Sequence, residues 1–204
     1  MKLLIASDIH GSATWCEKLM GAIEAESPDK VVLLGDLLYH GPRNDLPEGY
    51  APKQVISMLN GIAGSIAAVR GNCEAEVDQM VLDFPCMVDY ALLFDGTRQL
   101  FCTHGHLWNP ENMPAMASGK PSVRAGEQFG AQVDGQQSVR AGDQAGKQRD
   151  MLPSVFLYGH THVKQNQLVN DVLLVNPGSV SIPKDGSHSI ALYCDGEVEL
   201  RELQ

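Results

Sequence analysis

The residues that could do chemistry in this sequence are aspartates, histidines and an asparagine that follow short apolar segments. The clearest case is the apolar segment Val31–Leu34, which runs through a single glycine into Asp36. The start of the chain repeats this pattern, because the apolar residues 3–6 precede Asp8 and His10. Carboxylates and imidazoles are ligands that divalent metal ions use in proteins. The pattern therefore indicates a metal site built at the ends of strands.

Three later apolar segments end in the same way. The residues that follow them are Asn72, His104, and the pair His160 and His162. Residues two positions apart in an extended strand lie on one face, so the last pair could chelate an ion. Each motif alone is weak evidence, since Asp-x-His, Gly-Asp and Gly-Asn also occur in ordinary turns. Their repetition after one strand after another favours a metal centre.

The expected ligands are two carboxylates, one amide and four imidazoles. This set is larger than a single ion uses, and it suits two ions that share one bridging carboxylate. Oxygen and nitrogen ligands without a thiolate set favour Mn, Fe, Zn or Co in an open site over a closed structural zinc site. Asp36 is the candidate for the centre of this site, because the strand before it is apolar enough to be buried on both faces.

The elements that must position these residues begin with a β-α-β unit. The apolar segments at 2–6 and 31–34 flank residues 13–26, in which Trp15, Leu19 and Ile23 recur at helical spacing. A second one-faced helix is expected to begin at Pro52, where proline suits the first helical turn. Parallel strands joined by helices place ligands at the carboxyl edge of a sheet.

The back half of the chain is rich in strands. Segments 87–94 and 98–103 flank the turn sequence Asp95-Gly96-Thr97, which predicts a hairpin. Further alternating segments follow at 155–158 and from 168 to the end of the chain. An α/β front half and a strand-rich back half predict two sheets packed together and flanked by helices.

The length of 204 residues predicts a single domain over 1–204 with a sizeable core. One stretch, at about 111–150, is rich in Gly, Gln, Ala and Ser and contains a near-repeat, SVRAGEQ at 122–128 and SVRAGDQ at 138–144. Two copies are too few for a repeat architecture. The composition favours a flexible surface insertion, with a lid over the site or an oligomer contact as the alternatives.

The net charge limits the kinds of binding partner, and the cysteines indicate the cellular compartment. A formal net charge of -10 argues against an extended nucleic-acid surface, but it leaves room for a small anionic substrate beside a metal ion. No apolar segment approaches the roughly 20 residues of a membrane span. The odd number of cysteines, 5, and the lack of a secretory signal predict reduced thiols in a cytoplasmic protein. A homo-oligomer is compatible with all of this.

The spaced motifs resemble the signature of the calcineurin-like metallophosphoesterases. They span nearly the whole chain outside the insertion and are Asp8-x-His10, Gly35-Asp36, Gly71-Asn72, His104 and Gly159-His160-x-His162. Within this superfamily the chain looks most like the small bacterial YfcE-type phosphodiesterases. The short length supports this, as do Gly71-Asn72-Cys73-Glu74, Thr103-His104-Gly105-His106, Asn176-Pro177-Gly178-Ser179 and Ile182-Pro183-Lys184.

The resemblance implies a four-layer α/β/β/α sandwich with a dinuclear metal site at the sheet edges. It implies two divalent cations, preferably Mn²⁺, with Fe, Zn, Co or Ni as alternatives. One ion would be held by Asp8, His10, Asp36 and His162, and the other by Asp36, Asn72, His104 and His160.

The implied activity is hydrolysis of a small phosphodiester by a metal-bound hydroxide. A phosphomonoesterase or protein phosphatase of the same fold is the alternative. A non-catalytic, partner-binding scaffold is less favoured, because such a protein should have lost ligands and none of the expected set is missing.

The chain departs from the superfamily at Cys73, where the wider pattern has a histidine that helps to protonate the leaving oxygen. A thiol is a weaker hydrogen-bond donor than imidazole and less suited to general acid work. The catalytic candidates are therefore Asp36, Asn72 and Cys73, with His106 or His40 as substitutes for the missing imidazole. Three cations could clamp the phosphate, namely Arg43, Arg70 and Lys184.

Overall fold

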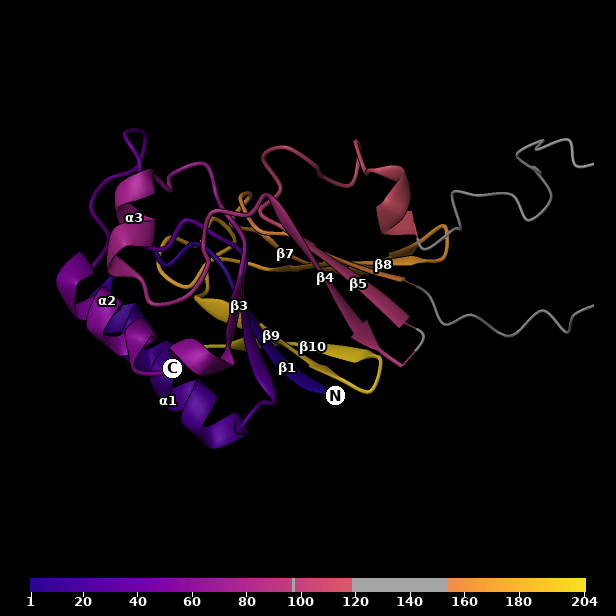
Figure 1. Cartoon of the computed structure of the whole chain (residues 1–204), viewed down its shortest axis with the longest axis horizontal. Helices are drawn as coiled ribbons and strands as arrows, with labels where there is room; N and C mark the ends of the chain where they lie inside the picture. Colours follow the sequence, from indigo (N-terminus) through magenta and orange to yellow (C-terminus); the bar gives the residue numbers. More distant parts are fainter. Residues whose placement is uncertain (97, 119–153) are drawn as a thin grey trace, which may run out of the picture.

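The computed structural model describes residues 1–96, 98–118 and 154–204, and two sheets of five strands each form its centre (Figure 1). The first sheet has the strand order β10-β9-β1-β2-β3. Its middle strand pairs in parallel with β2, and β2 pairs in parallel with β3, while β9 and β10 form an antiparallel edge. The bounds are β1 (Lys2–Ala6), β2 (Lys30–Leu33), β3 (Ile66–Ala68), β9 (Ser189–Cys194) and β10 (Glu197–Glu202).

The second sheet has the strand order β4-β5-β6-β8-β7, with parallel pairs in the middle and a hairpin at each side. The bounds are β4 (Tyr90–Asp95), β5 (Arg98–Thr103), β6 (Ser154–Leu157), β7 (Lys164–Val169) and β8 (Val172–Pro177). The expected hairpin is present, but β4 begins at Tyr90 instead of residue 87. The reason is that the carbonyl of Val88 accepts the backbone N–H of Arg70 at 2.8 Å, so this segment pairs with the loop after β3.

The helices lie together on the outer face of the first sheet (Figure 1). They are α1 (Ala13–Glu26), α2 (Pro52–Asn60) and α3 (Glu76–Val81), with the 3-10 helix η1 (Ala63–Ser65) leading into β3. The Oγ of Ser12 caps α1 by accepting the backbone N–H of Trp15 at 3.3 Å. Both predicted helices of the front half are confirmed. In the described residues, no helix has the length and apolar character needed to cross a membrane.

Alternation along β1 and β2 separates two cores. Leu4 and Leu33 pack toward the helices, whereas Leu3 and Val32 pack toward the second sheet. Successive side chains of a strand point to opposite faces, so apolar residues at every position mean burial on both sides. This confirms the prediction that these strands lie between two apolar layers.

A third cluster covers the outer face of the second sheet, where Phe101 and Phe156 stack with ring centroids 5.5 Å apart. Within the described residues, the short 3-10 helix η2 (Ala115–Ser118) packs on this face, and its Ala117 is fully buried against the cluster. The start of the expected insertion is therefore part of the packed fold, because it covers aromatic side chains. The rest of that stretch, with its near-repeat, lies outside the described residues.

Candidate metal centre

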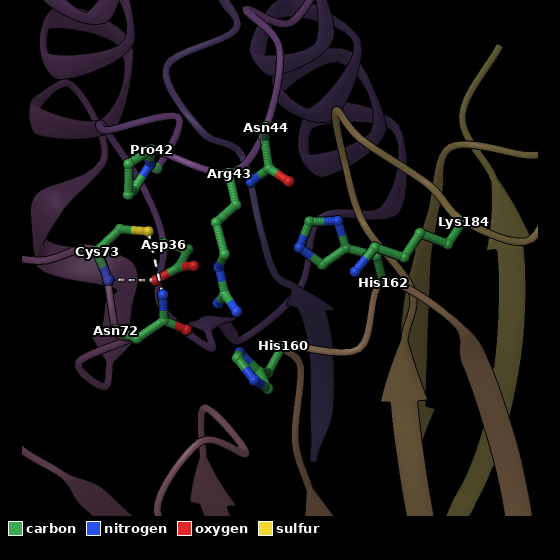
Figure 2. Close-up of a pocket in the computed structure, with 10 residues that line it drawn as sticks. Asp36, Pro42, Arg43, Asn44, Asn72, Cys73, His160, His162 and Lys184 are labelled. Carbon is green, nitrogen blue, oxygen red and sulfur yellow. Dashed lines mark hydrogen bonds between the residues drawn. The ribbon is translucent and has the colours of Figure 1, made fainter.

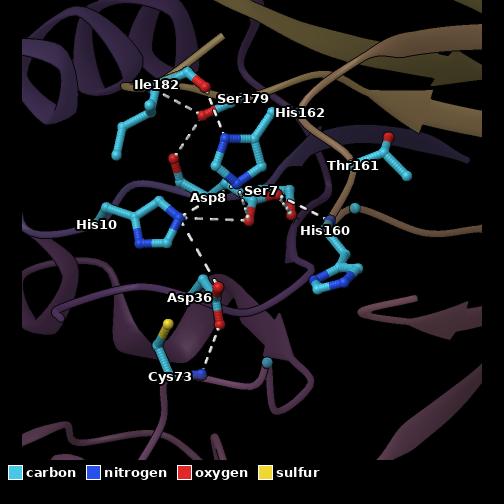
Figure 3. A network of polar contacts seen from close by, with 12 residues as sticks. Ser7, Asp8, His10, Asp36, Cys73, His160, Thr161, His162, Ser179 and Ile182 are labelled. Carbon is cyan, nitrogen blue, oxygen red and sulfur yellow. Dashed lines mark hydrogen bonds and ion pairs between the residues drawn. The ribbon is translucent and has the colours of Figure 1, made fainter. Parts of the chain in front are cut away.

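The predicted ligands converge where strands of both sheets end (Figure 3). The Oδ1 of Asp8 lies 3.1 Å from Nε2 of His162 and 3.5 Å from Nε2 of His10. The Oδ2 of Asp36 lies 3.7 Å from Nε2 of His10 and 3.5 Å from Nε2 of His104. Chain segments far apart in the sequence thus contribute to one compact cluster of nitrogen and oxygen atoms.

The remaining predicted ligands border this cluster. The Oδ1 of Asn72 lies 3.2 Å from Nε2 of His104. The His160 ring has its centroid 5.1 Å from that of His104, and both Asn72 and His160 line the pocket that opens onto the cluster. The structure therefore brings the predicted ligand set together at one place.

Three imidazoles are held so that Nε2 points into the cluster, with a free lone pair when the ring is neutral. The Nδ1 atoms of His10, His104 and His162 lie 2.8, 2.6 and 2.6 Å from the backbone carbonyls of Tyr39, Leu34 and Ile182. A carbonyl can only accept a hydrogen bond, so each Nδ1 carries the proton and each Nε2 is unprotonated in the neutral ring. This is how metal-binding histidines are usually fixed by their outer contacts.

One carboxylate oxygen needs a cation. Oδ1 of Asp8 is fully buried and has no hydrogen-bond donor within the described part of the chain, although two imidazole nitrogens lie near it. Nε2 of His10 also lies only 3.3 Å from Nε2 of His162, so two lone pairs face each other when both rings are neutral. An unpaired buried carboxylate oxygen is costly. A divalent ion would satisfy all of these groups, and the residues fit it.

The second carboxylate oxygen of Asp8 and its backbone carbonyl are held by hydrogen bonds that the sequence did not predict. Its Oδ2 accepts hydrogen bonds from Oγ of Ser7 at 2.6 Å and from the backbone N–H of His160 at 3.1 Å. Its backbone carbonyl accepts the hydroxyls of Ser179 and Ser181 at 2.9 and 3.1 Å. The Asn-Pro-Gly-Ser stretch was a visible signal for Ser179, but its role depends on a contact across 171 residues of sequence.

Asp36 is positioned by the loop that follows β3. The backbone N–H of Cys73 donates to Oδ1 of Asp36 at 2.8 Å. The carboxylate of Glu74 accepts hydrogen bonds from the backbone N–H groups of Asp36, Leu37 and Gly71 at 2.9, 2.6 and 2.5 Å. Glu74 therefore ties together the two loops that carry Asp36 and Asn72. This role of Glu74 could not be predicted from the sequence, because its partners are backbone N–H groups that no side-chain motif identifies.

Two glycines are required by close approach at this centre. A Cβ on Gly71 would overlap the carboxylate of Asp36, and a Cβ on Gly159 would overlap the hydroxyl of Ser7 and crowd Asp8. Neither glycine has a positive φ. A turn with positive φ therefore does not explain Gly71. Glycine is needed there because the Asp36 carboxylate occupies the space that a Cβ would fill.

The ligand residues themselves adopt left-handed backbone. The φ angles of Asp8, His10, Asp36, His160 and His162 are 58°, 48°, 54°, 65° and 59°. Non-glycine residues rarely adopt this region, and each such residue raises the energy of the chain relative to glycine. Each of these residues lies in the segment that follows a strand, and backbone outliers of this kind concentrate at functional sites.

The charges of the free site are strongly perturbed. Burial opposes ionisation of Asp8, but its contacts with His10 and His162 outweigh burial and hold the pKa of Asp8 well below its usual range. Burial likewise opposes the charged form of His104, but the adjacent Asp36 and the charge of Asp8 raise the pKa of His104 to about 9. The carboxylates are thus ionised at neutral pH and attract positive charge into the centre.

A pocket of about 350 Å³ opens onto these residues, and Figure 2 shows Arg43 reaching into it from the loop after β2. Lys184 lines the pocket on the side opposite Cys73 (Figure 2). Of the three cations considered as phosphate clamps, Arg70 does not line this pocket. Its guanidinium instead donates to Asp89, with Nη2 2.6 Å and Nε 3.0 Å from Oδ1.

The candidates for a proton donor differ in position. Cys73 lines the pocket, and burial together with the Asp36 carboxylate raises the pKa of its thiol, so the thiol is protonated at neutral pH. His106 does not line the pocket and packs beside His104, with ring centroids 5.3 Å apart. His40 lies between the rings of Tyr39 and Tyr50, at 4.7 and 5.4 Å, and does not line the pocket either.

Comparison with known proteins agrees with this geometry. The sequence model of the calcineurin-like phosphoesterase superfamily domain matches residues 1–195. The chain belongs to this superfamily. The protein is therefore a metal-dependent phosphoric ester hydrolase, and divalent metal ions are its cofactors.

Individual members of the superfamily show how close the relationship is. The chain is 39% identical to phosphodiesterase YfcE of Escherichia coli strain K12 over 198 residues, which cover 97% of this chain and 89% of YfcE. It is 24% identical to the probable metallophosphoesterase YsnB of Bacillus subtilis strain 168, over 90% of this chain and 78% of YsnB. The solved structure of E. coli YfcE, a phosphoesterase, superposes with a TM-score of 0.76 at 34% identity and covers 100% of both chains. The expected metallophosphoesterase fold is confirmed.

Proposed function

We propose that this protein is a phosphodiesterase that hydrolyses a small phosphodiester at a dinuclear metal centre. The observation that carries the proposal is the buried, unpaired Oδ1 of Asp8 beside two imidazole nitrogens that carry no proton when their rings are neutral. The relative named phosphodiesterase YfcE, 39% identical over nearly the whole chain, supports the choice of a diester over a monoester.

The ligands divide into two groups around Asp36, which lies between His10 and His104. One ion would be held by Asp8, His10, Asp36 and His162, and the second by Asp36, Asn72, His104 and His160. Mn²⁺ is the proposed ion, and Fe, Zn, Co or Ni would suit the same nitrogen and oxygen ligands. The free state of all cysteines agrees with a reducing, cytoplasmic setting.

Divalent ions held by these residues would make hydroxide available as the nucleophile near neutral pH, because such ions lower the pKa of water from 15.7 toward ~7. The protein's own residues do the remaining work. Arg43 and Lys184 bind the phosphate oxygens and hold the ester in line for attack. Asn72 and Cys73 line the same wall of the pocket, where an ester oxygen would depart.

The test is Asp36→Asn, with metal content and turnover measured together. An amide in place of the central carboxylate removes the negative charge shared by both ions, so we expect loss of both ions and nearly all diesterase activity with the fold retained. The control is Asp171→Asn at the exposed β7–β8 turn, which should keep both. Near-normal metal content and turnover in Asp36→Asn would disprove the dinuclear assignment. Mono- and diesters compared under one metal decide between phosphodiesterase and phosphomonoesterase.

A further inference from the structure

A second hollow, of about 380 Å³, adjoins the metal pocket and has a different chemical character. Side chains from the loop after β2, from α2 and from α3 form its walls, among them Leu38, Tyr39, Pro52, Ile56, Val77 and Val81. Its size is at the lower end for ligand pockets, enough for one substituted ring.

The walls of the hollow leave apolar surface open to water. Val77 is 57%, Tyr39 43% and Val81 38% exposed. The charged side chain in the lining, Asp78, is buried, and its Oδ2 accepts the backbone N–H of Ala75 at 2.8 Å. The hollow therefore offers apolar contacts, and contiguous exposed apolar surface of this kind commonly marks a binding site.

Cys73 connects the hollow to the metal pocket, because its side chain lines both. Its backbone N–H holds Asp36 at 2.8 Å, so the shared wall lies directly beside the central carboxylate. A phosphate bound at the metal centre would therefore carry one of its two ester groups past Cys73. The opposite side of the pocket is bordered by Lys184, which suits a charged or polar group (Figure 2).

We propose that this hollow binds one ester group of the substrate, and that this group is an apolar ring. The proposal rests on the phosphodiesterase function proposed above and extends it to a substrate class, diesters with at least one aromatic or bulky aliphatic alcohol. Burial of the ring against Tyr39, Ile56 and Val77 would hold the phosphorus atom at the metal centre through apolar contact as well as charge.

The test compares two symmetric diesters, diphenyl phosphate and bis(4-tert-butylphenyl) phosphate. Their leaving groups have nearly the same acidity, and symmetry places the same ring in the hollow whichever ester bond breaks. We expect kcat/KM to favour the tert-butyl diester by about 10-fold in the metal-loaded wild type, as extra methyl groups do in apolar pockets.

Val77→Asp places a carboxylate in the hollow and should reduce this preference to about 1-fold. Its control is Leu168→Asp on β7, since Leu168 is 58% exposed and lies outside the hollow. Leu168→Asp should keep the wild-type preference. No preference in the wild type, or an unchanged preference in Val77→Asp, would overturn the proposal while leaving the phosphodiesterase function intact.

If the metal-loaded protein hydrolyses no phosphodiester at all, the proposed function fails, and ligand binding alone then tests the hollow. Titration with 4-tert-butylphenol alone should then shift the NMR signals of the methyl groups of Ile56 and Val77 in the wild type. The Ile56 signal should not shift in Val77→Asp. Unperturbed methyl signals in the wild type would overturn the proposal.

Discussion

Cys73 should make hydrolysis depend on how easily the leaving group departs. Its thiol is protonated but is a weak donor, and a well-placed general acid contributes about 10²–10⁴-fold. We therefore expect aryl diesters with acidic phenols to be cleaved well and alkyl diesters to lag far behind. Cys73→His should narrow this gap more than it raises the aryl rate, and Cys73→Ser should change little.

The measurement for Cys73 is a leaving-group series with the wild type and both variants at fixed metal and pH. A shallow series in the wild type, or a collapse of alkyl hydrolysis in Cys73→Ser alone, would show that the thiol itself donates the proton. The neighbouring Glu74 is not free to orient a histidine at position 73. Its carboxylate is directed to three backbone N–H groups instead.

Glu74 therefore positions the two loops that carry Asp36 and Asn72, and we expect Glu74→Gln to weaken metal binding. The amide has a single acceptor oxygen for three N–H groups and brings a donor of its own. We expect the dissociation constant for the metal to rise about 10–100-fold, as for other outer contacts of metal ligands, with kcat largely restored at saturating metal. The control is the exposed Glu76→Gln. A lower kcat at saturating metal with unchanged metal affinity would contradict this role.

At the level of elements, one ion pair helps to hold the loop between β8 and β9. Asp185 accepts the backbone N–H of Lys164 at 2.6 Å and its Nζ at 2.9 Å. This pair fixes the loop whose Ile182 carbonyl orients His162 and whose Lys184 lines the pocket. Although partial burial works in the other direction, the contacts with Lys164 lower the pKa of the Asp185 carboxyl.

Because the pKa of Asp185 is lower in the folded chain than in the unfolded chain, its charge stabilises the fold above about pH 4. That stabilisation disappears as the pH falls through the lowered pKa. We expect Asp185→Asn to reduce the free energy of unfolding at pH 7 by no more than about 1 kcal/mol, the range for exposed ion pairs. Denaturant unfolding from pH 7 to pH 3 should show the difference from wild type shrink as the pH falls, with Asp171→Asn as the control. A difference as large at pH 3 as at pH 7 would exclude the ion pair as its cause.

The order of elements could be predicted from the sequence because apolar segments and turn residues record it directly. The predicted helix at 13–26 has the same bounds as α1, and the strands before Asp8 and Asp36 lie where expected. The predicted ligands also converge, since strand ends meet at a sheet edge. The start of β4 and the burial of Ala117 were not predictable, because each depends on a partner distant in the sequence. The same holds for Glu74 and Ser179.

At the scale of the whole molecule, the proposed metal centre joins the two sheets. Asp8 and Asp36 follow strands of the first sheet, while His104 and His162 follow strands of the second. Ions that bind this set stabilise the folded chain but not the unfolded one, by about 2.7 kcal/mol at a free metal concentration 100 times the dissociation constant. For a chain of this size that corresponds to a rise in Tm of roughly 5–10 °C.

Calorimetry of the protein treated with chelator and then supplied with Mn²⁺ would measure this rise. We expect the shift to be largely lost in Asp36→Asn, because the shared carboxylate is gone. An equal shift in that variant would mean that Mn²⁺ acts elsewhere on the protein.

The left-handed ligand residues give the fold a built-in conflict between folding and function. The apolar strands stabilise the fold. The turns that follow them hold five non-glycine residues in a left-handed conformation that glycine adopts at lower cost, namely Asp8, His10, Asp36, His160 and His162. A cation bound at the centre would offset this local cost, because the folded chain binds it and the unfolded chain does not. A lineage that kept this scaffold but lost its metal would feel no selection to retain those side chains, and glycine or asparagine should replace them first. A chain of this fold that carries glycine or asparagine at these positions is therefore expected to bind no ion there.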